Sequence, residues 1–133
     1  MTTQTKLQIR FNDIDLAGHV HNGVYLSYFE QGRLDFFKHL ATRGWDWRKY
    51  GLILARNEVD YLTPIKLHDN IVVHVSSEEV GTKSFTLSYQ IKSEDGNVIY
   101  TKGKSVMVCF DYLQNASVEV YSEWKEKLMS REK

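Results

Sequence analysis

The chain has 133 residues, a length that favours one domain with a sizeable apolar core. Its 17 Lys and Arg residues balance its 17 Asp and Glu residues, which argues against a protein that binds nucleic acid or anionic membranes, because such proteins carry a basic surplus. A content of 42% hydrophobic and 26% charged residues is typical of a globular protein rather than a disordered chain.

The single cysteine, Cys109, excludes an internal disulfide and fits a reducing compartment. The first ten residues lack the apolar segment of a signal peptide, and no run approaches the length that spans a membrane. We therefore expect one domain over residues 1–133 in a soluble, cytoplasmic protein.

The first part of the chain predicts a strand, a polar loop and a long helix. Apolar and polar residues alternate over residues 5–11, and a polar loop follows over residues 12–23. From Val24 the apolar residues recur at steps of three and four, which predicts a helix with Asn22 as its N-cap and Gly44 at its other end. The stripe consists of Tyr25, Tyr28, Phe29, Gly32, Phe36 and Leu40, and its expected polar edges are Glu30, Arg33 and Lys38.

The rest of the chain predicts four further strands and a short charged helix. Strands grouped after one helix indicate an α+β architecture, and the wide aromatic stripe requires a curved antiparallel sheet of about five strands to cover it. A long helix wrapped by such a sheet is the hotdog fold. The predicted segments are strands over 51–62, 71–76, 85–92 and 97–112, a tight turn at Asp95-Gly96, and a helix over 122–131.

The loop before the long helix holds the densest set of reactive side chains, namely Asp13, Asp15, His19, His21 and Asn22. The start of the helix adds unpaired backbone N–H groups and a partial positive charge. A carboxylate, an imidazole and a helix terminus that stabilises an anion are the groups required for acyl transfer at a carbonyl. The loop is therefore a candidate site for that chemistry.

Other chemistries find weaker support in the sequence. His19 and His21 with Asp15 suggest a metal site, but zinc chemistry calls for a firmer set of ligands, so we expect no metal. We expect no cofactor either, because neither a dinucleotide fingerprint nor a phosphate-binding P-loop occurs. Cys109 lies inside a predicted strand and is expected to be a small buried residue rather than a nucleophile.

The sequence resembles the hotdog acyl-CoA thioesterases, and most of all the 4-hydroxybenzoyl-CoA thioesterase-like branch, with plant acyl-ACP thioesterases as cousins. The likeness covers about residues 5–115. It is carried by Asp13-x-Asp15-x-x-Gly18-His19-Val20-x-Asn22, then by Tyr25, Tyr28, Phe29, Glu30 and Arg33, and later by Tyr61-x-x-Pro64 and Lys83-Ser84-Phe85.

The resemblance implies roles for the loop residues. Asp15 matches the catalytic carboxylate, which attacks the thioester carbonyl directly or activates a water molecule. Asp13 is expected to bind loop amides, and backbone amides near Asn22 and Gly23 are expected to hold the oxyanion. His19 falls where acyl-ACP thioesterases carry a histidine, and it polarises the substrate, positions the loop or fills space.

The resemblance also implies a substrate and an assembly. Tyr25 is expected to line the acyl pocket, and Lys83 and Ser84 to lie near the nucleotide and pantetheine of an acyl-CoA. A homodimer or homotetramer is expected, in which Val59 and Tyr61 of a second subunit complete the pocket. The alternatives are an acyl-ACP thioesterase and a non-catalytic module that binds acyl-CoA, whereas hydratase chemistry requires a motif that the sequence lacks.

Overall fold

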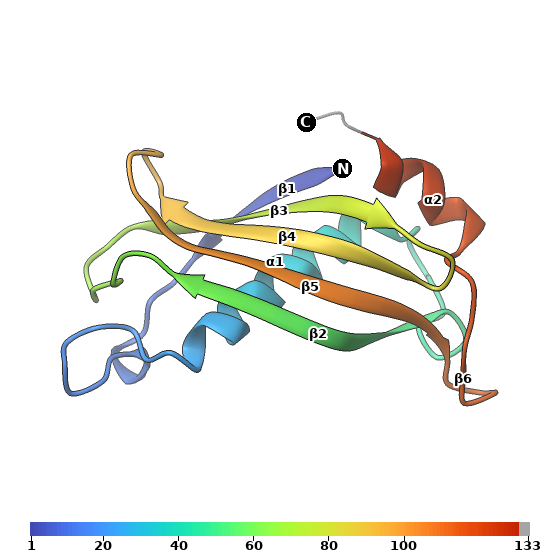
Figure 1. Ribbon diagram of the computed structural model, residues 1–133, viewed down its shortest axis with the longest axis horizontal. Helices are drawn as coiled ribbons and strands as arrows, with labels where there is room; N and C mark the ends of the chain where they lie inside the picture. Colours follow the sequence, from blue (N-terminus) through green and yellow to red (C-terminus); the bar gives the residue numbers. More distant parts are fainter. Residues whose placement is uncertain (131–133) are drawn as a thin grey trace.

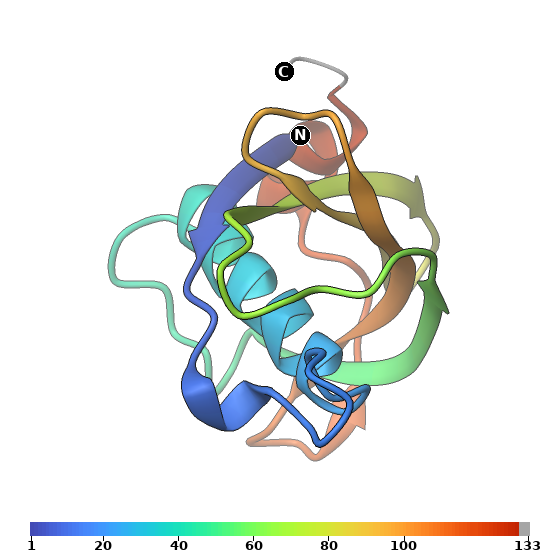
Figure 2. The same cartoon turned by 90° about the vertical axis from the view of Figure 1, so that its left-hand side faces the viewer.

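One antiparallel sheet curls around one long helix in the computed structural model, which describes residues 1–130 (Figures 1 and 2). This arrangement confirms the predicted α+β hotdog architecture, with a two-residue sixth strand that the sequence pattern did not predict. The elements in chain order are β1 (Thr2–Leu7), a 3-10 helix (Phe11–Asp13), α1 (Val24–Leu40), β2 (Gly51–Tyr61), β3 (Ile71–Val80), β4 (Ser84–Ser93), β5 (Ile99–Asp111), β6 (Ala116–Ser117) and α2 (Ser122–Met129).

The strands lie in the order β1-β3-β4-β5-β2, and β6 pairs with β5. β1 and β2 therefore form the two edges of the main sheet. The sheet has two distinct ends, because Tyr61 pairs with Thr101 at one end of β2 while Gly51 pairs with Phe110 at the other. The loop between β1 and α1 lies at the Tyr61 end, and α2 lies at the Gly51 end (Figure 1).

The apolar stripe of α1 packs into the concave face of the sheet, where Tyr25, Tyr28, Phe29 and Phe36 are buried as predicted. The ring of Phe29 stacks on Tyr89 of β4, with 4.3 Å between ring centroids and 8° between planes. It also lies against Gly103 of β5, where an added Cβ would stand 2.5 Å from the Phe29 ring. Glycine at this position thus lets the helix approach the sheet closely.

The β4–β5 connection confirms the turn predicted at Asp95-Gly96. Gly96 has a φ of +82°, which glycine adopts without strain, and its N–H donates to the Ser93 carbonyl at 2.8 Å. Oδ1 of Asp95 accepts hydrogen bonds from the Ser93 hydroxyl and the Asn97 N–H. The turn therefore fixes the register of the two central strands.

Several predicted boundaries were wrong. The first strand is Thr2–Leu7 rather than 5–11, because pairing with β3 ends at Leu7. The N-cap of α1 is Gly23 without a side-chain hydrogen bond, not Asn22, and the helix ends at Leu40, well before Gly44. Helix α2 ends at Met129, and the predicted extension to residue 131 lies outside the described residues. Within residues 1–130, no helix combines the length and apolar character required to cross a membrane.

Candidate functional site

The loop before α1 folds as a small hairpin around Asp15. The Gly18 N–H donates to the Asp15 carbonyl at 3.1 Å, and the Asp15 N–H donates to the His19 carbonyl at 2.9 Å. Gly18 has a φ of +81°, a conformation that side chains rarely adopt, so glycine is the residue suited to this turn. The Val20 N–H donates to the Ile65 carbonyl at 2.8 Å, which ties the hairpin to the β2–β3 connection.

The Asp15 carboxylate is exposed, and one of its oxygens is fixed by the loop. Oδ1 accepts hydrogen bonds from the N–H groups of Ala17 at 2.9 Å and His19 at 3.4 Å. Within residues 1–130, no group donates to Oδ2. The carboxylate is thus held in one orientation while one oxygen stays available to a substrate or water molecule.

Asp13 accepts from one loop amide, as predicted, and also holds the loop onto the helix, which was not predicted. Its Oδ2 accepts hydrogen bonds from the Tyr28 hydroxyl at 2.7 Å and the Arg10 N–H at 2.9 Å, and its carbonyl accepts one from the His21 N–H at 2.8 Å. Burial and the neighbouring Asp13 carboxylate both raise the pKa of Tyr28, so the hydroxyl stays protonated and donates at neutral pH.

The two predicted oxyanion amides differ in their partners. The Gly23 N–H donates to Nδ1 of His21 at 3.0 Å and is therefore engaged. The Asn22 N–H has no acceptor among residues 1–130. The Asn22 carbonyl accepts a hydrogen bond from the Tyr61 hydroxyl at 3.1 Å, which fixes the peptide that follows.

Tyr25 and Tyr61 pack edge to face beside this loop, with 4.9 Å between ring centroids. Tyr25 is buried, and burial raises its pKa; the hydrogen bond to the Ile65 backbone opposes this effect, while the charges of Tyr61 and Asp15 add to it. Tyr61, which we expected from a second subunit, thus already reaches the site of its own chain. Val59 lies half-buried two residues earlier on β2, opposite Gly103.

Lys83 and Ser84 lie at the far end of the sheet from Asp15 within one chain. Ser84 pairs with Val108, close to the Gly51 end of β2 (Figure 1). The chain alone therefore does not bring these two residues to the loop.

The His19 imidazole makes no hydrogen bond within residues 1–130, and the two hydrogen bonds between this half-buried residue and Asp15 use the His19 backbone. In the part of the chain that the structure describes, no three His, Cys, Asp or Glu side chains are grouped so that they could hold a metal ion. Cys109 is fully buried, and burial raises the pKa of its thiol to about 11, so it is not an activated nucleophile.

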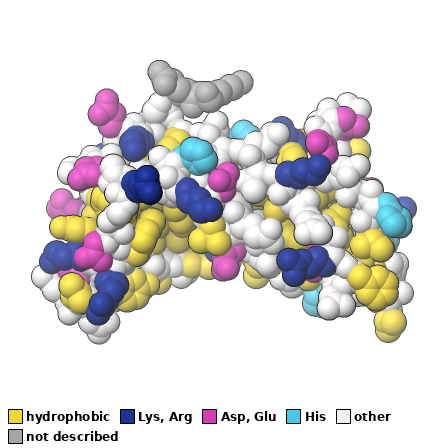
Figure 3. Space-filling model, turned by 180° about the vertical axis from the view of Figure 1, so that it is seen from behind, with side chains coloured by type: hydrophobic (Ala, Val, Ile, Leu, Met, Phe, Trp, Pro, Cys, Tyr) yellow, Lys and Arg dark blue, Asp and Glu magenta, His cyan; other side chains and the backbone are white. Residues whose placement is uncertain are grey.

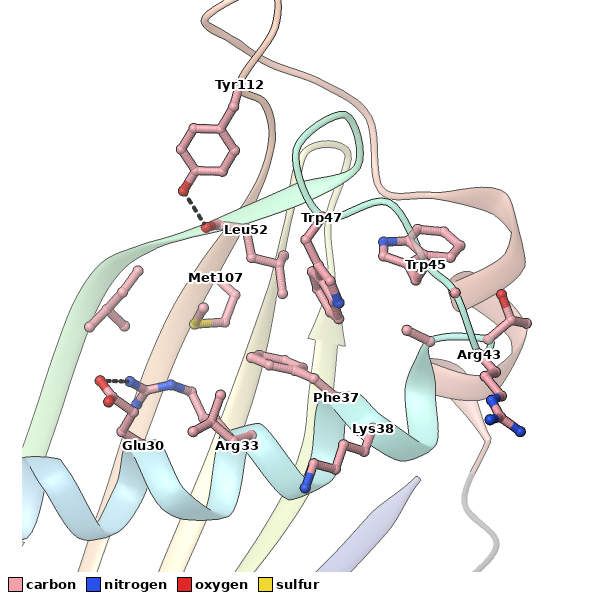
Figure 4. A pocket seen from close by; sticks show the side chains of 15 residues that line it. Glu30, Arg33, Phe37, Lys38, Arg43, Trp45, Trp47, Leu52, Met107 and Tyr112 are labelled. Atoms are coloured by element: carbon pink, nitrogen blue, oxygen red, sulfur yellow. Dashed lines mark hydrogen bonds and ion pairs between the residues drawn. The ribbon is translucent and has the colours of Figure 1, made fainter.

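A groove of about 940 Å³ lies between the C-terminal half of α1 and the strands β2 and β5 (Figure 4). Its apolar lining includes Leu34, Phe37, Trp47, Leu52, Leu54 and Met107. Arg33 also lines it, and this residue is buried rather than at a polar edge of α1 as predicted. The helical spacing of Arg33 from Phe29 and Phe37, four residues on either side, is the signal that places it on the buried face.

Comparisons with known proteins identify the family. A model of the thioesterase-like superfamily matches residues 9–128. Long-chain acyl-CoA thioesterase FadM of Escherichia coli (strain K12) is 24% identical over 126 residues, which are 94% of this chain and 96% of FadM.

Two solved structures share the whole fold. A predicted thioesterase from Bacillus stearothermophilus has a TM-score of 0.85 and 26% identity, covering 96% of this chain and 94% of that one. A thioesterase from Thermus thermophilus, solved with coenzyme A and Zn, has a TM-score of 0.83 and 29% identity, covering 96% of this chain and 97% of that one. With its hotdog fold and an exposed carboxylate beside the start of the long helix, this chain belongs to the thioesterase-like superfamily.

Proposed function

We propose that this protein is an acyl-CoA thioesterase, which hydrolyses a CoA thioester to a free carboxylic acid and CoA. The observation that carries the proposal is that one short loop holds both a carboxylate oxygen, Oδ2 of Asp15, and a backbone N–H, that of Asn22, without a partner among residues 1–130. The thioesterase relatives and the coenzyme A bound to the Thermus protein support the choice of substrate.

Asp15 supplies the carboxylate of the reaction. Its Oδ2 either attacks the thioester carbonyl carbon, forming an anhydride that water then hydrolyses, or removes a proton from a water molecule that attacks the same carbon. In both routes the C–S bond breaks, the acyl group gains an oxygen and the departing sulfur gains a proton. The bonds from Ala17 and His19 to Oδ1 keep the carboxylate in position for either route.

The Asn22 N–H is the donor for the negative charge that develops on the carbonyl oxygen. It lies at the start of α1, where the helix dipole favours an anion. Gly23, which we also predicted as a donor, would contribute only after its bond to His21 opens. The imidazole of His19 has no hydrogen-bond partner in the described part of the chain. We assign it to positioning the substrate beside Asp15.

A homodimer formed through β2 would complete the site. β2 is a long strand at the edge of the sheet, and an unpaired edge favours pairing with another strand. A two-fold axis that keeps both long helices on one side of the joined sheet makes the two β2 strands antiparallel. The Gly51 end of one copy then lies beside the Tyr61 end of the other, so Lys83 and Ser84 of one copy come toward Asp15 of the other.

The exposed hydrophobic residues fit this assembly. Leu16 and Phe11 on the Asp15 loop are 109% and 80% exposed, and Leu54 and Tyr61 are exposed on β2. Figure 3 shows hydrophobic side chains along the lower edge of the α1 face and at the end of the molecule that carries the loop. A second copy would cover these side chains, and pairs of such dimers would give the homotetramer.

The test is release of free thiol from a panel of aroyl-CoAs and of short-, medium- and long-chain acyl-CoAs, followed with a colorimetric thiol reagent. We expect turnover of at least one class, reduced about 100-fold or more in Asp15→Asn, the loss typical of a missing positioned base. Asp69→Asn is the matched control, because Asp69 is also a loop aspartate that accepts a backbone N–H, from Lys66 at 2.8 Å. Its turnover should equal that of the native protein.

The alternatives give different results. Turnover of acyl-ACP without turnover of any acyl-CoA would show that the carrier is ACP rather than CoA, with the same catalytic loop. Tight binding of acyl-CoA with no hydrolysis would show a binding module. An unchanged rate in Asp15→Asn would disprove the role of this carboxylate.

A further inference from the structure

The groove beside α1 combines an apolar lining with one buried cation. The Arg33 side chain is only 7% exposed, yet it lines the groove together with Glu30. Figure 4 shows the two side chains next to each other at one end of the groove, near Met107. A buried guanidinium is costly unless acceptors satisfy its five N–H donors, so the partners of Arg33 decide what this end of the groove can bind.

The protein satisfies Arg33 incompletely. Nη1 donates to the Tyr89 hydroxyl at 3.3 Å. Nη2 lies 3.7 Å from the carboxylate of Glu30, whose side chain is 67% exposed. An ion pair at this distance, with one partner in solvent, contributes little to the stability of the fold. These are the only two interactions of the guanidinium among residues 1–130, which leaves donors available to a molecule in the groove.

The Tyr89 hydroxyl that accepts from the guanidinium belongs to a row of polar side chains. Tyr89 is buried, and the Ser105 hydroxyl, which approaches it, donates to Oδ1 of Asn57 on β2 at 2.5 Å. This polar row runs from α1 across β4 and β5 to β2, and its bond to Tyr89 restricts the orientation of Arg33 before any ligand binds. A donor that is partly ordered before binding costs less to fix in place, which favours affinity.

From these contacts we infer that Arg33 is a specificity-determining residue, which donates hydrogen bonds to an uncharged oxygen substituent, a hydroxyl or oxo group, on the acyl part of the substrate. Glu30 balances the charge of Arg33, so a neutral oxygen fits better than a second carboxylate. The inference rests on the proposed function and extends it to the class of acyl group.

The position of the groove agrees with this role. The groove lies beside the Gly51 end of β2, and in the antiparallel dimer proposed above this end lies beside the Asp15 loop of the other copy. The lining of Phe37, Leu52 and Met107 would hold the apolar part of the acyl group while Arg33 contacts its oxygen. A site built to bond an oxygen discriminates against the analogue that lacks it, because its own polar groups are then left unpaired.

The test compares matched pairs of acyl-CoAs that differ by one oxygen: omega-hydroxydecanoyl-CoA with decanoyl-CoA, and hydroxybenzoyl-CoAs with benzoyl-CoA. Affinities are measured by calorimetry on the Asp15→Asn protein, so binding is read without turnover, and kcat/KM is measured on the native protein. We expect the oxygenated member of at least one pair to be favoured about tenfold or more. Adding Arg33→Met, which keeps the length of the side chain but removes its donors, should bring that ratio close to one.

The ratio is taken between two ligands on one protein, so a general loss of stability does not change it. Arg33→Lys provides a second variant that keeps the charge, and it should retain part of the preference. Equal affinity of both members in every pair, or a preference that survives in Arg33→Met, would overturn the inference. Absence of hydrolysis would count against the proposed function alone, since the affinity ratio still tests Arg33.

Discussion

The Tyr28 hydroxyl donates a 2.7 Å hydrogen bond to Oδ2 of Asp13, which joins the first turns of α1 to the loop that carries Asp15. Tyr28 is buried at the helix–sheet interface, so this hydrogen bond anchors the loop to the core of the fold. The catalytic carboxylate we propose thus depends on a contact two residues before it in the chain.

Tyr28→Phe should therefore weaken both the fold and the reaction. Loss of a hydrogen bond to a carboxylate costs about 1.5–3 kcal/mol, and we expect a decrease of this order in the free energy of unfolding, measured with urea. We also expect kcat to fall about tenfold or more, because Asp15 is no longer held in place. Thr5→Val is the control: its hydroxyl also donates to a carboxylate, that of Asp35, at 2.8 Å, and it lies on β1, the sheet edge away from the proposed dimer, so stability should fall while kcat stays unchanged. Equal kcat in the two variants would contradict the role of Tyr28.

The sequence alone was sufficient where the relevant residues are close in the chain. Periodicity identified the buried face of α1, and the loop from Asp13 to Asn22 is contiguous, so its chemistry can be recognised without a structure. The N-cap was predicted wrongly because the backbone carbonyl of His21 accepts the Val24 N–H at 2.9 Å, which is a first-turn amide that an Asn22 cap would bind. That competition is decided by loop geometry.

Contacts between distant segments could not be predicted in this way. The separation of Lys83 from Asp15 follows from the register of β4, β5 and β2, which no local pattern encodes. The groove is formed by α1, β2, β5 and the loop between α1 and β2, so its lining emerges only once these elements have packed. At Arg33 the charge predicts a polar edge while the helical spacing predicts burial, and packing against the sheet decides for burial.

Tyr61→Phe should lower kcat with little effect on stability. The Tyr61 hydroxyl fixes the Asn22 carbonyl from an exposed position, and its removal frees the peptides around the proposed oxyanion donor. Because an exposed hydrogen bond contributes little to folding, we expect a change below about 1 kcal/mol in the free energy of unfolding. Loss of aligned transition-state stabilisation should lower kcat about tenfold while KM changes less. A rise in KM alone would instead make Tyr61 a residue of ground-state binding.

Cys109 should make the fold sensitive to high pH. Burial raises the pKa of its thiol from an ordinary value of 9.0 to about 11, so in this range the unfolded chain holds fewer protons than the native one, and stability falls as pH rises. The raised pKa of Tyr28 acts in the same direction. Urea denaturation at successive pH values should show the decrease, and it should be smaller in Cys109→Ala. A thiol reagent should label the single cysteine only after unfolding; rapid labelling of the native protein would disprove its burial.

Charge placed on the β2 edge should separate the subunits and abolish turnover together. In an isologous dimer, Ala55→Asp puts two like charges close to each other across the paired β2 strands, where the exposed Ala55 lies at the bulge between Leu54 and Arg56. The same charge on the opposite edge, Gln4→Asp on β1, is the control, because Gln4 is also exposed on an edge strand. Light scattering after gel filtration should give a monomer for the first variant and the native mass for the second, and thiol release should follow the mass. Full activity in a monomeric Ala55→Asp protein would show that one chain suffices, and would place Lys83 and Ser84 outside the site.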